Sequence, residues 1–139
     1  MPDAATLIGT ADIPLRAGGL RLPDAFASPF LDGGVLTLWL DGCLALWPLS
    51  AWRLIANRVA GLPVTVEDGR AFSRLLFASA TPFAGRRVVL PAGLRTAAGI
   101  GDRAVLIGVG GHAELWSTER WSEQEARNRL EDLSLPLAV

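Results

Sequence analysis

The sequence predicts one α+β domain built from two related halves, and three observations lead to this prediction. An eighteen-residue segment recurs after 69 residues, an Asp-Gly pair divides a long apolar stretch, and helical periodicity follows the first copy. The chain has 139 residues, of which 50% are hydrophobic and 19% are charged. Such a composition can bury a core and is not that of a disordered protein.

The repeat is the strongest of the three observations. Residues 35–52 read VLTLWLDGCLALWPLSAW, and residues 104–121 read AVLIGVGGHAELWSTERW, without a gap at the offset of 69. Both segments contain the same W-x4-W spacing, so four of the five tryptophans fall at equivalent places. The alternative, two unrelated hairpins in one domain, needs this match to arise by chance.

The repeated unit extends upstream, because Leu22-Pro23 matches Leu90-Pro91 at an offset of 68, each after a turn rich in Gly and Arg. We predict repeat 1 at residues 8–51 and repeat 2 at residues 77–120, each a strand, turn, short strand, short helix, hairpin and helix. Such units of roughly 45 residues are too small to bury a core alone. We therefore expect the halves to pack together with pseudo-twofold symmetry.

The apolar stretch from Gly33 to Trp52 carries one charge, Asp41, and is long enough to span a bilayer. However, Asp41-Gly42 lies between two apolar runs, where glycine suits the positive φ of a type I′ turn. We predict two buried strands and a protein without a membrane span. The start, Met1-Pro2-Asp3, also lacks the basic residues of a signal peptide.

Residues 61–76 are expected to form a linker and a helix. Residues 60–63 have turn chemistry, residues 64–67 look extended, and Phe72, Leu75, Leu76 and Ser79 have the spacing of a helix over about 68–80.

A C-terminal helix is expected over 121–135, beginning near the N-cap Ser117 and stopped by Pro136. Glu123/Arg127 and Glu125/Arg129 have the spacing of stabilising i,i+4 pairs. Ala126, Leu130 and Leu133 would supply its apolar stripe.

The sequence offers little for catalysis, cofactors or metals. One cysteine, Cys43, and one histidine, His112, cannot form a disulfide or a structural zinc site. The absence of lysine excludes Schiff-base and P-loop lysine chemistry. Cys43 begins a buried-looking strand, and His112 aligns with it at a turn, so we interpret His112 as a turn or surface residue. We expect no enzyme, no cofactor, no metal site and no small-molecule substrate.

Two glycine patterns, at residues 99–104 and 108–113, resemble nucleotide-binding motifs. A phosphate-binding loop follows a strand and opens a helix, whereas the first pattern precedes a strand and the second leads into one. Hairpin turns explain both. The paired tryptophans are interpreted as core and helix anchors in preference to platforms for stacked bases.

Arginine carries the informative charge pattern. Residues 1–69 have four Arg against seven acids, whereas residues 70–139 have nine against seven, and six of these with a single acid lie in residues 70–103. Arg86-Arg87 stands at a turn before a strand, where guanidinium groups could reach phosphates or guanine edges. The alternative is that Arg86 and Arg87 lie in a solvent-exposed turn and contact no nucleic acid.

With these features the chain resembles the MraZ family of bacterial regulators, which have two AbrB-like (SpoVT-AbrB) half-domains. The resemblance covers residues 7 to about 133. It is carried by LIGT (7–10), DGCLALWPL (41–49), RAFSRLLF (70–77), AVLIGVG (104–110) and ELWSTERW (114–121). It implies tandem swapped-hairpin β-barrel halves with flanking helices. It also implies a cytoplasmic, nucleoid-associated transcriptional regulator that assembles as a homo-oligomeric ring and binds DNA repeats upstream of the division and cell-wall gene cluster.

In that family each half carries an Asp-x-x-Gly-Arg turn, whose arginine faces DNA and whose aspartate braces the loop. Here the second turn keeps Arg87, but Arg86 replaces the glycine and Phe83 stands at the aspartate position. The first turn has Gly19 in place of the arginine, and Leu15, or Arg16 with a one-residue gap, in place of the aspartate.

The resemblance therefore implies Arg87 as the principal DNA contact, with Arg86 beside it. Arg16 and Arg21 are candidate substitutes in the first turn. The missing motif residues leave a second hypothesis open, an oligomeric protein-interaction module that has lost DNA binding.

Overall fold

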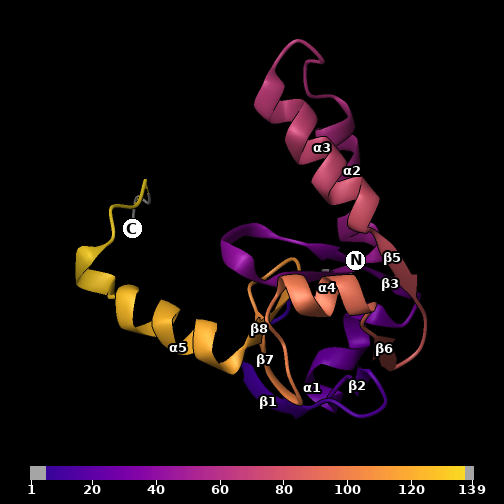
Figure 1. The fold of residues 1–139 in the computed structure, drawn as a ribbon, viewed down its shortest axis with the longest axis vertical. Helices are drawn as coiled ribbons and strands as arrows, with labels where there is room; N and C mark the ends of the chain where they lie inside the picture. Colours follow the sequence, from indigo (N-terminus) through magenta and orange to yellow (C-terminus); the bar gives the residue numbers. More distant parts are fainter. Residues whose placement is uncertain (1–5, 137–139) are drawn as a thin grey trace.

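Two antiparallel sheets and five α-helices form the molecule in the computed structural model, which describes residues 6–136 (Figure 1). The first half contains β1 (Thr10–Pro14), β2 (Gly19–Arg21), α1 (Asp24–Ala27), the 3-10 turn η1 (Ser28–Phe30), β3 (Gly34–Leu38), η2 (Leu40–Gly42), β4 (Leu44–Pro48) and α2 (Leu49–Ala60). After α3 (Glu67–Ser79) come β5 (Thr81–Phe83), β6 (Arg87–Val89), α4 (Ala92–Ala97), β7 (Arg103–Gly108), β8 (Ala113–Ser117), α5 (Thr118–Arg127) and η3 (Leu130–Asp132). The order strand, strand, helix, strand, strand, helix thus occurs on both sides of α3.

The strand pairing interleaves the two halves. The larger sheet has the order β1-β7-β8-β4-β3-β5, and β2 pairs with β6 in a two-stranded ribbon. The first strand of each half pairs with the hairpin of the other half, because β1 lies beside β7 and β5 lies beside β3. If each strand is replaced by its equivalent in the other half, the sheet has the same strand order, read from its opposite edge. Its centre is the β4–β8 pair, where Ala45 lies opposite Glu114, and the centre of the ribbon is Leu20 opposite Val88.

The Asp-Gly hairpin is confirmed. Asp41 and Gly42 have φ values of 63° and 85°, as a turn with two left-handed residues requires, and they connect β3 to β4. Arg120 of α5 holds this turn from outside, since its Nη1 donates to the carbonyl oxygens of Gly42 and Ala97, each at 2.9 Å. The turn, the end of α4 and the start of α5 are therefore tied together by one guanidinium.

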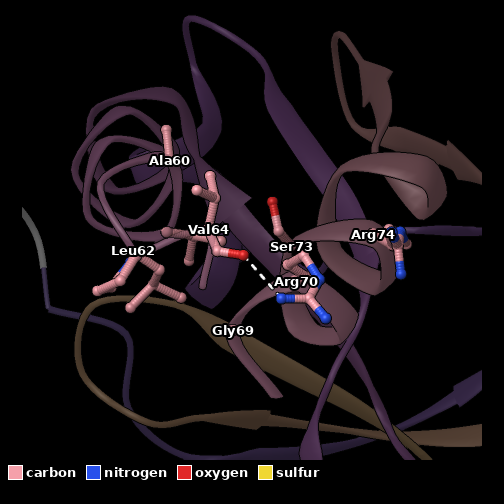
Figure 2. Close-up of a pocket in the computed structure, with 9 residues that line it drawn as sticks. Ala60, Leu62, Val64, Gly69, Arg70, Ser73 and Arg74 are labelled. Carbon is pink, nitrogen blue, oxygen red and sulfur yellow. Dashed lines mark hydrogen bonds between the residues drawn. The ribbon is translucent and has the colours of Figure 1, made fainter. Parts of the chain in front are cut away.

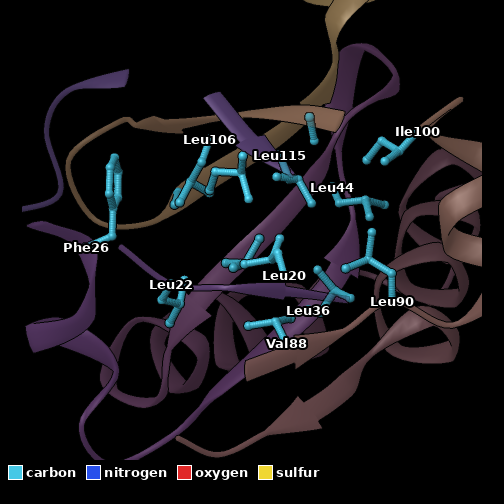
Figure 3. Packing of buried hydrophobic residues seen from close by; sticks show 14 of the residues in the cluster. Leu20, Leu22, Phe26, Leu36, Leu44, Val88, Leu90, Ile100, Leu106 and Leu115 are labelled. Carbon is cyan, nitrogen blue, oxygen red and sulfur yellow. The ribbon is translucent and has the colours of Figure 1, made fainter. Parts of the chain in front are cut away.

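The main core lies between the ribbon and one face of the larger sheet (Figure 3). Leu20 and Val88 enter it from the ribbon, and Leu36 and Leu106 enter it from the sheet, all at most 1% exposed. Alternate residues of a strand point to opposite faces. A second cluster on the other face contains Cys43, Val105, Ile107 and Trp116, with Trp39 and Trp121 packed against it.

The helix predicted over 68–80 is confirmed by α3, which packs with α2 in a helical hairpin that projects from the body (Figure 1). The extended segment predicted at residues 64–67 is wrong. Residues 63–66 form a turn in which the Val66 N–H donates to the Pro63 oxygen at 3.1 Å. Glu67 and Asp68 then stand in the first turn of α3, where carboxylates suit the helix dipole.

The prediction of Ser117 as an N-cap is confirmed, because its Oγ accepts the Arg120 N–H at 3.1 Å. The prediction of a helix to residue 135 is wrong, since α5 ends at Arg127 and Asn128 leaves the helical region with a ψ of 81°. Leu130 and Leu133 are 83% and 45% exposed. An amphipathic helix depends on burial of its apolar stripe, and these leucines find nothing to pack against within the described residues.

Candidate nucleic-acid interface

The outer face of the β2–β6 ribbon carries a pair of arginines directly opposite each other. Leu20 and Val88 point inward, so the neighbouring pair of Arg21 and Arg87 points outward, and both side chains are exposed. Like charges opposite each other in an antiparallel pair repel. This repulsion is relieved when an anion lies between or over the two guanidinium groups.

A groove of about 550 Å³ beside this ribbon brings together all four arginines predicted as site residues. It is lined by Ile13, Pro14, Arg16, Gly19, Arg21, Leu22, Pro23, Asp24, Arg86 and Arg87. Arg16 and Arg21 come from the first half, and Arg86 and Arg87 come from the second half, about 65 to 70 residues later in the sequence. Four cations thus face one carboxylate, that of Asp24, within this lining.

Arg86 is held firmly at the edge of the groove. Its Nε and Nη2 donate to the Leu22 carbonyl oxygen at 3.1 and 2.7 Å, and Nη2 forms an ion pair with Asp24. The sequence does not indicate that Asp24 belongs to this site. Its only distinctive feature in the sequence is an acidic side chain just after Pro23, at the start of a short helix. Much of the positive charge of Arg86 is therefore balanced locally.

Arg87 reaches across from β6 to the first turn. Its Nη2 donates to the carbonyl oxygens of Arg16 and Ala17 at 2.7 and 3.3 Å. That turn is tight, because Ala17 and Gly18 have φ values of 51° and 75° and Arg16 and Gly19 exchange two backbone hydrogen bonds. The guanidinium remains exposed while its position is fixed by these contacts.

Arg16 and Arg21 have exposed side chains, and neither forms an ion pair or side-chain hydrogen bond within residues 6–136. An arginine fork without a protein partner is suited to bidentate contact with a phosphate. The groove thus combines two positioned guanidinium groups with two that are available for an anion.

The other arginines of the basic stretch lie elsewhere. Arg70 and Arg74 line a second hollow of about 220 Å³ near the tip of the α2–α3 hairpin, where Arg70 Nη1 donates to the Val64 oxygen at 2.7 Å (Figure 2). Arg95 donates to the carbonyl oxygens of Ile100 and Gly101. The basic stretch is therefore divided between surfaces, and only Arg86 and Arg87 of it reach the groove.

The sequence predicts His112 to be a turn or surface residue; it does lie in a turn, but it is not a surface residue. His112 lies at the β7–β8 turn, but its side chain is only 18% exposed and its ring stacks on Trp47 with 4.3 Å between centroids. Its Nε2 lies 3.9 Å from a carboxylate oxygen of Glu114. The burial comes from Trp39 and Trp47 of the other half, and the sequence around the turn does not show that these tryptophans lie beside it.

Cys43 is buried, and its Sγ donates to the Leu40 oxygen at 3.3 Å. Burial, with smaller contributions from the nearby carboxylates of Glu114 and Asp41, raises the pKa of its thiol far above the ordinary value. The thiol therefore stays neutral in the folded protein at pH values where it ionises in the unfolded chain. Folding keeps its full stability below the pKa of the unfolded thiol and loses stability as the pH rises above that pKa.

We expect the free energy of unfolding to fall by about 1.4 kcal/mol per pH unit between about pH 9 and pH 10.5. The chain contains neither lysine nor tyrosine, so no other side chain of ordinary pKa titrates in this range. Urea unfolding at several pH values measures the slope, and Cys43→Ala should flatten it. A slope that persists unchanged in the alanine variant would contradict this assignment.

Within residues 6–136, no three His, Cys, Asp or Glu side chains gather as metal ligands would. In the same part of the chain, no helix has both the length and the apolar character needed to cross a membrane. The hairpin explanation is confirmed for the second glycine pattern, which lies in the turn between β7 and β8, and is wrong for the first. Gly99 follows the end of α4, where its φ of 67° terminates the helix before β7 begins. The structure thus concentrates its candidate functional residues at the ribbon.

Comparison with known proteins points in one direction. The family described as "MraZ protein, putative antitoxin-like" matches residues 84–136. The chain is 39% identical to the transcriptional regulator MraZ of Thermomicrobium roseum over 110 residues, covering 77% of this chain and 78% of that protein. It is 34% identical to the protein of the same name from Pediococcus pentosaceus over 122 residues, covering 84% and 85%. The chain therefore belongs to the MraZ family of transcriptional regulators, which are not enzymes.

Proposed function

We propose that the chain binds duplex DNA as a transcriptional regulator and that the groove beside the β2–β6 ribbon meets the sugar-phosphate backbone. The observation that carries the proposal is the convergence of Arg16, Arg21, Arg86 and Arg87 on one groove whose lining has a single carboxylate. Its relatives are named transcriptional regulators. A net charge of −1 for the chain does not oppose this, because phosphate contacts depend on the local field.

The target we propose is a set of DNA repeats in the promoter of the division and cell-wall gene cluster, bound by a homo-oligomeric ring. A cytoplasmic location at the nucleoid follows from that target. Few arginines per chain give weak binding, and several copies on adjacent repeats raise the overall affinity through effective concentration. The family resemblance supports these finer points.

The architecture we propose is a pair of AbrB-like swapped-hairpin halves, residues 8–51 and 77–120, related by pseudo-twofold symmetry. The exchange of strands β1 and β5 between the halves supports it, as does the sheet order that stays unchanged when the halves are swapped. The ribbon at the symmetry axis then presents both turns on one side of the molecule.

The test is fluorescence anisotropy of a labelled duplex carrying the repeats upstream of the gene cluster, titrated at several salt concentrations. The expected result is binding at low salt that weakens with a log–log slope near −0.9 per phosphate neutralised. A duplex of scrambled sequence is the control for specificity. Absence of binding at low salt by a protein whose oligomer is intact would overturn the proposal.

A second candidate function is an oligomeric protein-interaction module. The exposed apolar side chains of the α2–α3 hairpin favour it, among them Leu54, Val64 and Leu75, which are 62%, 78% and 53% exposed. The double variant Arg86→Ala/Arg87→Ala separates the two functions in a promoter-reporter assay. It should abolish regulation by DNA binding and should leave an interaction module active.

A further inference from the structure

An apolar groove that the proposed DNA contact does not use runs along α3. A hollow of about 60 Å³ lies between this helix and the end of β3, and it is lined by Leu38, Trp39, Leu40, Phe72, Leu75 and Leu76. A second hollow of about 460 Å³ shares Leu38 and Leu75 with the first and extends to α4. The two hollows therefore adjoin, and together they are called the α3 groove.

The α3 groove leaves large apolar side chains in contact with water. Leu40 and Leu75 are each 53% exposed, whereas Leu76 in the same lining is 1% exposed and holds α3 on the body. Arg74 lines the second hollow, no acidic side chain lines either one, and the Arg74 guanidinium has no hydrogen bond or ion pair within residues 6–136. An apolar surface beside an unpaired arginine is typical of a protein interface.

The C-terminal segment, residues 128–136, has the complementary character. Leu130 and Leu133 are 83% and 45% exposed, and Glu131 and Asp132 stand between them. Neither carboxylate forms an ion pair in the part of the chain that the structure describes. The sequence after residue 129 contains no basic residue. An acidic segment rich in leucine thus matches an apolar groove that is flanked by a cation.

The α3 groove and the C-terminal segment of one chain lie apart. Helix α5 packs on β7 and β8 and then leads away from the body, so the described end of the chain lies well away from the α2–α3 hairpin (Figure 1). Each surface therefore stays uncovered in its own chain. Two different, complementary surfaces on one chain produce a head-to-tail contact between copies, which closes into a ring when the rotation between copies allows it.

We propose that the C-terminal segment of one copy docks in the α3 groove of a second copy. The leucines of the segment enter the two hollows, and a carboxylate of Glu131 or Asp132 pairs with Arg74 at the edge of the groove. The proposal rests on the homo-oligomer put forward above and names the surfaces that join its copies. Neither surface includes the β2–β6 ribbon, so the arginines of every copy stay open to DNA.

Two complementary variants test the proposal, because each removes one side of the contact. Leu130→Asp/Leu133→Asp alters the segment, and Arg74→Glu/Leu75→Glu alters the groove. All four side chains are exposed, so neither variant disturbs the core. Each variant alone should weaken the contact at least about 100-fold, about tenfold for each side chain, and should sediment as a monomer where the wild type is a ring.

An equimolar mixture of the two variants should form one-to-one dimers and nothing larger, because one intact segment meets one intact groove. Sedimentation velocity measures this. The matched control is Leu31→Asp/Val109→Asp, which places the same charges at two exposed apolar positions outside both surfaces and should keep the wild-type assembly. A mixture that stays monomeric would overturn the head-to-tail contact, as would either variant that still assembles as the wild type does.

Exchange of charge between the two surfaces tests the ion pair. Arg74→Glu should weaken assembly about tenfold, and adding Glu131→Arg/Asp132→Arg to the same chain should restore it to within about threefold, since every contact joins Arg74 of one copy to the acids of the next. Absence of rescue would overturn the pairing.

Failure of this contact and failure of the proposed DNA binding give different results. Wild-type protein that binds the promoter duplex as a monomer would overturn the docking contact alone, and its groove would then be covered by its own segment or by another protein. Wild-type protein that assembles through these surfaces but binds no duplex at low salt would support the contact and overturn the DNA binding.

Discussion

The double variant Arg21→Ala/Arg87→Ala should lose about 100-fold in DNA affinity at moderate salt, since a charge-assisted contact to phosphate contributes about tenfold per arginine. The two residues lie opposite each other on the exposed face of the ribbon, and neither supports the core, which is formed by Leu20 and Val88 between the strands and the sheet. Anisotropy titrations at several salt concentrations measure the loss. The log–log slope should become shallower by about 1.8, because about two phosphates are no longer neutralised.

The matched control is Arg53→Ala/Arg58→Ala, which removes two exposed arginines from α2 and changes the net charge equally. It should keep affinity within about twofold, because distant surface charges are largely screened at physiological salt. Equal losses in the two double variants would show that the effect comes from total charge. Such a result would contradict the assignment of the interface to the ribbon.

Leu20→Ala should destabilise the fold by about 2 to 5 kcal/mol, the usual range for truncation of a fully buried leucine. Leu20 is 1% exposed and lies at the centre of the ribbon, opposite Val88 (Figure 3). Its loss leaves a cavity beneath the strands that carry the arginines, within the core that joins the ribbon to the sheet. Urea unfolding monitored by tryptophan fluorescence measures the change.

Leu31→Ala is the corresponding control, because Leu31 is 81% exposed and its truncation opens no cavity. We expect its effect to stay within about 0.5 kcal/mol, as for ordinary surface substitutions. A loss below about 1 kcal/mol in Leu20→Ala would contradict the placement of the core between ribbon and sheet.

The parts of the fold that depend on nearby residues could be predicted from the sequence. The Asp41-Gly42 turn, the Ser117 cap and the helix near residues 68–80 are each specified by chemistry within a few residues. The repeat added the equivalence of the two hairpins. These predictions needed no information about which segments meet in space.

The errors come from contacts between distant segments. The stripe of Leu130 and Leu133 satisfies the periodicity of a helix, but the fold brings no partner to bury it, and α5 ends at Arg127. His112 has the sequence context of a turn, whereas Trp39 and Trp47 of the other half enclose its ring. Sequence spacing cannot show either outcome.

The candidate site shows the same limit. Arg16 and Arg21 are named from the sequence only as substitutes for a motif that repeat 1 lacks. Pairing of β2 with β6 places them beside Arg86 and Arg87, and it also brings the partners Leu22 and Asp24 to Arg86. Single-residue signals identified the arginines, while the groove that unites them depends on cross-half pairing.

The central claim is that DNA lies on the ribbon, and amide hydrogen exchange with and without the promoter duplex tests it most directly. Exchange reports protection residue by residue, so it locates the surface that the duplex covers. We predict protection confined to residues 16–24 and 84–90, with no change at α2, α3 or α5. Protection of the α2–α3 hairpin or of α5, with the ribbon unchanged, would contradict the account.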